Sequence, residues 1–210
     1  MTLYIFGAGG GTKELLESKE CLCPQVFKKI KLIEDNPNRE FLFDIPIISM
    51  KDFNNEDVSS FDWAFISCSD PKFKERIDKA YPNLSWISFA HRNCDCLLKD
   101  IGIGNWFGYG THIPSDLKVG RHVRVNYNGV FGHDCEIGDY SFIGINATVC
   151  ATTKIGKGVY VGSNAVIINK HLTIGDFSII GAGSVVTKNV PENVVVMGIP
   201  ARVIRKIDKL

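Results

Sequence analysis

A repeat of six residues constrains the fold of this chain more than any other feature of its sequence. Large apolar residues stand at every sixth position from Ile101 to Ile167, twelve in succession, and after a slip of one residue they resume at Ile174, Ile180 and Val186. Glycine follows ten of these fifteen positions. A helix repeats every 3.6 residues and an ordinary strand every 2, so neither explains a period of six.

This period predicts an all-β parallel β-helix with a triangular cross-section. Each six-residue rung forms one face, three rungs form a coil of 18 residues, and the apolar residues stack along the axis. Residues 18 apart then lie above one another at about 4.8 Å, the spacing of neighbouring strands. Glycine or asparagine is expected where the corners need positive φ. A glycine-rich sandwich would not hold this phase, and we place the β-helix at residues 91–210.

The first ninety residues show a different pattern, in which short apolar strands alternate with helices. We expect strands at 3–6, 29–33, 63–67 and 84–89, and helices at 12–19 and 70–80. Asp70 is a suitable N-cap for the second helix, with Pro71 in its first turn. The alternation predicts a small α/β domain with a parallel sheet at residues 1–90. It is too short for a two-halved dinucleotide fold, so we expect a half-Rossmann-like sheet suited to one nucleotide.

A glycine-rich loop at residues 7–11 lies between the first expected strand and helix. This position is typical of loops whose backbone N–H groups hold a phosphate. We therefore assign substrate contacts to the loop, to Asp35 at the end of the next strand, and to Asp70; the loop residues are Gly7, Ala8, Gly9 and Gly10. Thr12 replaces the third glycine of the usual motif, and a tight structural turn is the alternative interpretation of these glycines.

Charge and composition exclude several classes of function. The formal net charge is +1 and no basic block is present, which disfavours a nucleic-acid partner. No apolar run approaches the roughly 18 residues that span a bilayer, so we expect no membrane insertion. The first residues do not resemble a signal peptide, and the seven cysteines follow no paired spacing. These features predict a cytoplasmic protein with reduced thiols.

Among the five histidines, His133 has the most informative surroundings. It stands two residues after the inward-facing Phe131, near a corner of the β-helix, and Asp134 and Cys135 follow it. Cys135 is expected to face the interior. The histidines at 112, 122 and 171 fall at other places within their rungs and do not converge with His133, so we expect no metal site.

Three segments of the chain resemble one family of enzymes. Gly132-His-Asp-Cys-Glu-Ile-Gly138, the run from Ile180 to Pro191 and Gly198-Ile-Pro-Ala-Arg202 are similar to motifs of the nucleotide-amino-sugar acetyltransferases with a left-handed β-helix. This family includes bacillosamine and perosamine N-acetyltransferases and sialic acid O-acetyltransferases. The start of the chain, Ile5-Phe-Gly-Ala-Gly-Gly10, resembles the family's nucleotide-sugar domain.

The resemblance implies a homotrimer that binds acetyl-CoA between neighbouring β-helices and transfers the acetyl group to a nucleotide-linked amino sugar. His133 is then the general base, and Asp134 holds its tautomer. Residue 151 lies 18 positions after His133, so the Ala151 amide is expected to bind the developing oxyanion. We assign coenzyme contacts to Ala151, Ser163 and Ala182.

The chain departs from the family in three places. Phe142 stands where a second histidine is usual, Gly10-Gly11-Thr12 replaces a glycine–histidine–glycine ending, and His91-Arg92 replaces a histidine–proline pair. The first departure removes a polar contact near the reacting groups, which leaves O-acetylation of a sugar hydroxyl open as an alternative. A non-enzymatic β-helical binding protein is the alternative from a different class.

Overall fold

The computed structural model describes residues 1–18, 27–98, 100–168 and 171–208. The chain divides into two compact units, Met1–Ser88 and Phe89–Leu210, where the sequence suggested a boundary at residue 90. Each unit is described by itself. No helix among the described residues is long and apolar enough to cross a membrane.

The first unit is built on a five-stranded sheet in the order β3-β4-β2-β1-β5. Its elements are β1 (Thr2–Phe6), α1 (Gly10–Glu17), β2 (Lys29–Glu34), β3 (Phe41–Leu42), β4 (Ile45–Ser49), α2 (Met50–Phe53), β5 (Trp63–Ile66) and α3 (Pro71–Ala80). All pairs are parallel except β3–β4. The chain leaves β1 toward β2 on one side, whereas β5 lies on its other side, so the strand order reverses at β1.

The continuous apolar sequence of β1 is explained by the burial of this central strand. Residues 3–6 of β1 are all buried, as expected for a parallel strand covered on both faces. On one face, Phe53 of α2 packs edge-on against Tyr4 and Phe6 with ring centroids 5.1 Å apart, and Ile77 of α3 joins the same cluster. The strand expected at 84–89 is wrong: Trp86 makes one isolated bridge to Ala64, and Phe89 belongs to the second unit.

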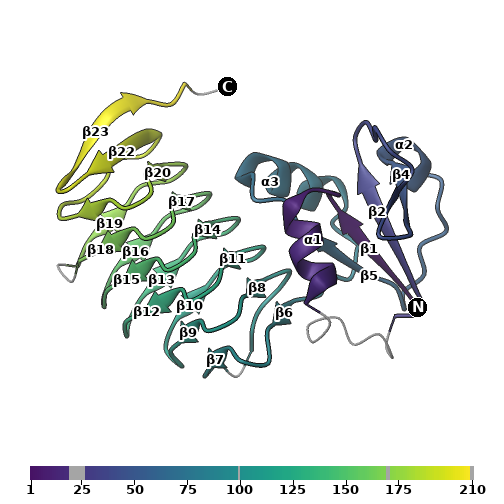
Figure 1. The fold of residues 1–210 in the computed structure, drawn as a ribbon, viewed down its shortest axis with the longest axis horizontal. Helices are drawn as coiled ribbons and strands as arrows, with labels where there is room; N and C mark the ends of the chain where they lie inside the picture. The colour runs from purple at the N-terminus through teal and green to yellow at the C-terminus, as the bar shows by residue number, and fades with distance from the viewer. Residues whose placement is uncertain (19–26, 99, 169–170, 209–210) are drawn as a thin grey trace. The chain divides into compact units, whose positions relative to one another are not determined.

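The second unit is a β-helix of parallel strands, most of them two residues long, and its last strand (Ala201–Lys206) pairs antiparallel with the strand before it (Figure 1). The strands are β6 (Phe89–Ala90), β7 (Asp95–Cys96), β8 (Trp106–Phe107), β9 (His112–Ile113), β10 (Lys118–Val119), β11 (Arg124–Val125), β12 (Val130–Phe131), β13 (Glu136–Ile137), β14 (Phe142–Ile143), β15 (Thr148–Val149), β16 (Lys154–Ile155), β17 (Tyr160–Val161), β18 (Val166–Ile167), β19 (Thr173–Ile174), β20 (Ile179–Ile180), β21 (Val185–Val186), β22 (Val194–Gly198) and β23 (Ala201–Lys206).

These strands form three sheets, the faces of the prism. Face I is β10-β13-β16-β19, face II runs from β6 through β8, β11, β14, β17 and β20 to β22 and β23, and face III is β7-β9-β12-β15-β18-β21. Partners in the middle coils are 18 residues apart, as in Arg124↔Phe142↔Tyr160, whereas the step is 17 in the first coil, as in Phe89↔Trp106. The step becomes 19 where Lys154 pairs with Thr173, which is the slip seen in the sequence.

The predicted apolar stack forms the core of this unit. Phe107, Ile143 and Ile180 are fully buried members, and all fifteen repeat positions lie in or against the same cluster. The corners differ from expectation in one respect. Positive φ occurs at Asn128, Asn146 and Asn164 as predicted, but also at residues of other types: His122, Asp134, Tyr140, Thr152, His171 and Phe177. The stack of coils therefore imposes this conformation on residues that do not favour it.

Candidate active site

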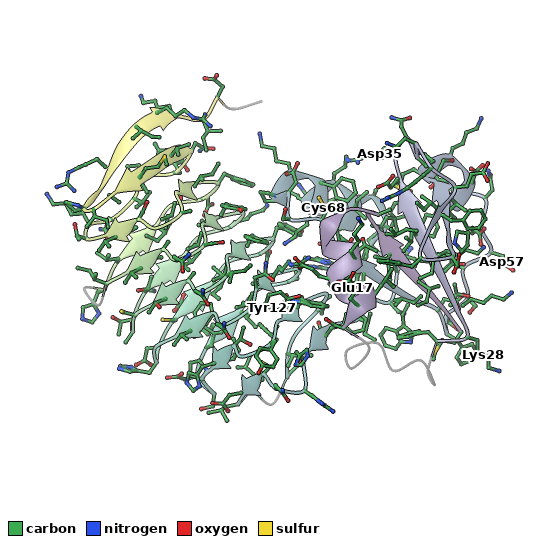
Figure 2. All side chains as sticks on the ribbon, viewed as in Figure 1. Glu17, Lys28, Asp35, Asp57, Cys68 and Tyr127 are labelled. Carbon is green, nitrogen blue, oxygen red and sulfur yellow. The ribbon has the colours of Figure 1, made fainter. Side chains whose placement is uncertain are left out.

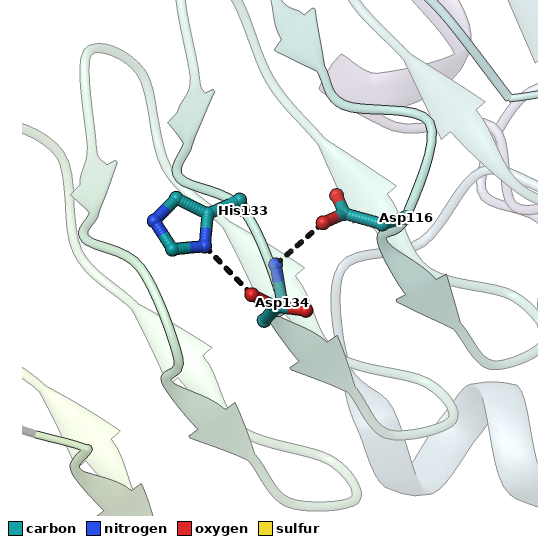
Figure 3. A group of neighbouring side chains, drawn as sticks. All are labelled: Asp116, His133 and Asp134. Atoms are coloured by element: carbon teal, nitrogen blue, oxygen red, sulfur yellow. Dashed lines mark hydrogen bonds and ion pairs between the residues drawn. The ribbon is translucent and has the colours of Figure 1, made fainter.

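The corner between faces III and I carries His133 and Asp134. The chain leaves β12, passes Gly132 and turns through these two residues before entering β13. His133 Nδ1 lies 2.7 Å from Asp134 Oδ2, and both side chains are about two-thirds exposed, at 68% and 67% (Figure 3). An ionised carboxylate only accepts hydrogen bonds, so this contact places a proton on Nδ1 and leaves Nε2 as the acceptor.

The corner of the next coil places an amide beside this pair. The Thr152 N–H donates to the His133 carbonyl oxygen at 2.9 Å, which fixes the two corners against each other. The N–H of Ala151 has no acceptor among the described residues. A Cβ at Gly132 would stand 2.5 Å from the Ala151 nitrogen, so only glycine leaves this amide uncovered. A histidine acceptor and an unused N–H donor thus occur on neighbouring coils.

Asp116, in the corner one coil earlier, was not found by sequence reasoning. Its Oδ2 accepts a hydrogen bond from the Asp134 N–H at 3.0 Å (Figure 3). Ligand atoms of Asp116, His133 and Asp134 lie within 4.8 Å of one another, the only such group found among the described residues. The spacing of 18 residues between Asp116 and Asp134 was the available signal.

Cys135 faces the interior, as predicted. It is 1% exposed, and its thiol donates to the Cys150 carbonyl oxygen at 3.3 Å. Burial raises the pKa of the Cys135 thiol, which disfavours the thiolate that a nucleophile needs. The site therefore offers a base without a paired cysteine nucleophile.

Other predicted residues lie elsewhere on the β-helix. Ser163 and Ala182 occupy the corner between faces II and III, so a single chain does not bring them to His133 and Ala151. Phe142 lies on face II, where its ring stacks on that of Tyr160 with centroids 4.7 Å apart. Within one chain, Phe142 and His133 therefore belong to different parts of the prism.

The other histidines have separate surroundings. His112 Nδ1 lies 2.7 Å from Asp95 Oδ2 on face III. His122 is buried and stacks on Tyr140, and His91 Nδ1 accepts from the Asn93 N–H at 3.1 Å. None of these three histidines belongs to the group of Asp116, His133 and Asp134 found among the described residues.

In the first unit, the glycine loop lies at the carboxyl edge of the sheet. Gly7 has a φ of +102°, and Gly9 is the N-cap of α1. A Cβ at Gly9 or Gly10 would meet no atom within 4 Å, so the space in front of the loop is open. The Thr12 hydroxyl contacts the Gly7 carbonyl oxygen at 2.7 Å and the Ser67 hydroxyl at 2.6 Å, which pins the loop to the chain after β5.

Acidic and basic side chains lie beside this loop. Glu34 contacts it, because its Oε1 accepts from the Ala8 N–H at 3.1 Å. The assignment of Asp35 as a substrate contact stays a prediction. Asp35, labelled in Figure 2, forms an ion pair with Arg76 at 2.5 Å. Arg39 donates to the Ala8 carbonyl oxygen and places a cation beside the loop.

Asp70 has a structural role in the described chain. Its Oδ1 accepts from the Lys72 N–H at 2.9 Å and from the Phe73 N–H at 3.4 Å, which caps α3 as predicted. Its assignment as a substrate contact stays a prediction.

Part of the β-helix is similar to a known protein family. Residues 134–169 match the model of the bacterial transferase hexapeptide family, described as six repeats. The matched residues are 36 of the 210 in the chain and lie within the second unit. The chain is 39% identical over 123 residues to galactoside O-acetyltransferase of Escherichia coli K12, covering 49% of the chain and 58% of that relative. With the bifunctional protein GlmU of Lawsonia intracellularis it shares 41% over 85 residues, 37% of the chain and 18% of the relative.

Two solved structures resemble the chain along almost its whole length. WeeI from Acinetobacter baumannii AYE has a TM-score of 0.88 at 28% identity, covering 97% of this chain and 100% of WeeI. A mutant perosamine N-acetyltransferase from Caulobacter crescentus, solved with CoA and GDP-perosamine, has a TM-score of 0.83 at 21% identity, covering 97% and 96%. The second likeness concerns the fold alone. The first supports a β-helix of the left-handed type.

Proposed function

We propose that this protein moves the acetyl group of acetyl-CoA to the amino group of a nucleotide-linked amino sugar. The observation that carries the proposal is the III–I corner, where a histidine held by a carboxylate lies one coil from an unused backbone amide. A general base and an oxyanion donor are the two groups that acyl transfer to an amine requires.

The proposed reaction is a direct transfer. The amine nitrogen attacks the thioester carbonyl carbon, and the Ala151 N–H stabilises the negative charge that develops on the carbonyl oxygen. His133 Nε2 takes the proton that the nitrogen loses. The carbon–sulfur bond then breaks, and the imidazolium returns the proton to the departing thiolate. Asp134 keeps Nδ1 protonated and stabilises the imidazolium between these steps.

The nucleotide is assigned to the first unit. In open parallel sheets, ligands bind beyond the carboxyl ends of the strands, where the strand order reverses. The Gly7–Gly10 loop and the residues after β5 meet this description. The N-terminus of α1 and the Arg39 guanidinium favour the negative charge of a diphosphate. This half-Rossmann-like arrangement would hold one nucleotide.

A homotrimer is part of the proposal. Ser163 and Ala182 lie on a different corner from His133. A coenzyme that contacts both corners therefore requires a second β-helix beside the first. Sedimentation should give a trimer, and a stable monomer with full activity would contradict this arrangement.

A substrate screen tests the reaction. Nucleotide-linked amino sugars are incubated with acetyl-CoA while thiol release is measured, and the product is analysed for an N-acetyl group. We expect release only with an amino sugar. Transfer to a sugar hydroxyl is the second candidate, which the 39% identity to galactoside O-acetyltransferase favours. It would appear as thiol release with galactosides and an ester product. Absence of acetyl-CoA binding in a calorimeter would instead indicate a non-enzymatic protein.

A variant of Gly9 tests the nucleotide site separately. Gly9→Val places its side chain in open space, so the melting temperature should not change. The side chain should keep a phosphate from the backbone, and binding of the sugar nucleotide should fall about tenfold or more. Acetyl-CoA binding should persist. Equal loss of both ligands would contradict the separate nucleotide site.

A further inference from the structure

We propose that Asp116 is a positioning residue, which holds Asp134 in the conformation that orients His133. This inference rests on the proposed function, because it assigns His133 as the base. Asp116 lies one coil before Asp134 and contacts its backbone, while the Asp134 side chain contacts the histidine ring (Figure 3). The three residues thus form a chain of contacts that ends at His133 Nδ1.

The bond between Asp116 and Asp134 departs from a pattern found at other corners. At eleven of them, the amide at the left-handed position donates to a backbone carbonyl oxygen of the preceding coil, at 2.8 to 3.1 Å. These amides belong to Gly110, His122, Asn128, Tyr140, Asn146, Thr152, Gly158, Asn164, Phe177, Gly183 and Asn193. At Asp134 the acceptor is instead a side-chain carboxylate at 3.0 Å. The regular backbone contact is replaced at the corner that carries His133.

The sequence of the preceding corner explains this exception. Pro114 follows the inward-facing Ile113 at a position where glycine is usual. The Leu117 N–H donates to the Pro114 carbonyl oxygen at 3.2 Å, as at ordinary corners, so the difference lies in the residues before Leu117. Asp116 does not adopt positive φ, unlike the equivalent residues Asn128, Asp134 and Asn146. The altered turn leaves the carboxylate of Asp116 to satisfy the amide above it.

A charged acceptor is well suited to this task. Asp134 holds a φ of +57°, which residues with a Cβ adopt reluctantly, and a charge-assisted hydrogen bond to its N–H stabilises that conformation. If the bond is lost, residue 134 is free to rotate, and its carboxylate loses its fixed position beside Nδ1. The histidine would then sample both tautomers, and only one leaves Nε2 free to accept a proton.

Few other charges face this ring in the described chain. Asp134 lies in the same corner and Asp116 in the corner before it. The corner after it, residues 150–153, has no charged side chain. On the adjoining face I, Glu136 pairs with Lys118 at 3.1 Å and with Lys154 at 3.6 Å. The orientation of His133 therefore depends on the two aspartates.

Two substitutions of Asp116 separate its role in positioning Asp134 from its negative charge. Asn keeps an oxygen that accepts the Asp134 N–H, whereas Ala removes it. Asp116→Ala should lower kcat about tenfold with KM unchanged, and Asp116→Asn should restore most of the activity. Asp176→Ala is a matched control, because Asp176 Oδ1 also accepts an amide of a neighbouring coil, that of Lys157 at 2.9 Å, at a different corner. The control should retain kcat.

Nitrogen-15 NMR of the neutral histidine rings tests the inference without any substrate. The His133 signals are assigned by their loss in His133→Ala. We expect a protonated Nδ1 in the parent protein, in Asp116→Asn and in Asp176→Ala, and a mixture of tautomers in Asp116→Ala. An unchanged tautomer in a folded Asp116→Ala protein would overturn the inference, as would equal damage from Ala and Asn. Failure of the proposed reaction alone would leave the NMR result intact.

Discussion

Two histidine–aspartate pairs on the β-helix have the same Nδ1–Oδ2 distance of 2.7 Å but lie in different surroundings. His112 and Asp95 come from neighbouring strands of face III, whereas His133 and Asp134 are consecutive residues of a corner. On the flat face, the backbone N–H of His112 donates to the Gly129 carbonyl oxygen. At the corner, the Ala151 N–H remains available. A histidine held by a carboxylate therefore supplies only the base of the proposed site. The oxyanion donor, the Ala151 N–H, is found beside the pair at the corner and not beside the pair on the face.

Removing the base should produce the largest effect in this comparison. His133→Ala should lower kcat by roughly 10²- to 10⁴-fold, the usual contribution of a general base. The fold should persist because the exposed ring lies outside the apolar core, and the sugar nucleotide should still bind. Steady-state kinetics with calorimetry measures both. Turnover near that of the parent protein between about pH 6 and pH 9 would remove His133 from the mechanism.

Covering the amide should have the next largest effect. Gly132→Ala places a Cβ against the Ala151 nitrogen and should lower kcat about 10²-fold or more, as for a lost oxyanion donor. Gly138→Ala is the control, since its Cβ would stand 2.6 Å from the Lys157 nitrogen at another corner. Both variants should melt at lower temperature. If kcat per folded molecule falls equally in both, the role of the Ala151 amide is wrong.

Weakening the contact between the Asp134 carboxylate and His133 should lower kcat by a smaller factor. Asp134→Asn keeps an acceptor oxygen for Nδ1–H but removes the charge that stabilises the imidazolium. We expect kcat to fall roughly tenfold, equivalent to about 1.4 kcal/mol, with little change in KM. A loss as large as that of His133→Ala would mean that Asp134 takes a more direct part in proton transfer.

Disrupting the second pair should have the smallest effect. His112→Asn removes a surface pair with half-exposed partners, which is worth at most about 1 kcal/mol of stability. Neither kcat nor KM should change by more than about twofold. A loss of activity comparable to that of Asp134→Asn would show that face III takes part in the reaction, and the distinction between the two pairs would no longer hold.

The β-helix could be predicted from the sequence because each rung repeats the same pattern of apolar and small residues. An apolar residue every six positions specifies the core, and a one-residue slip is visible at Ile167. The hairpin of β3 and β4 was missed because its turn, at Phe43 and Asp44, has positive φ without the glycine or asparagine that usually signals it. Strands as short as Phe41–Leu42 also leave no periodic pattern to detect.

The candidate site was predictable where its residues are close in sequence or separated by one coil. His133, Asp134 and Ala151 meet this condition. Asp116 also lies one coil from Asp134, but its role depends on how Pro114 reshapes a corner, which the repeat does not encode. The contact of Glu34 with the glycine loop depends on the direction of its side chain, which no sequence pattern specifies.

The change from an 18-residue to a 19-residue step has a consequence for how such a chain varies in length. An insertion within a strand would turn every later aliphatic side chain away from the axis, whereas an insertion at a corner leaves the stack in register. The extra residue lies between Ile167 and Ile174, in the column of corners that includes His133 and Ala151. Length changes at this column of corners would therefore alter the surroundings of residues such as His133 and Ala151 without loss of the core.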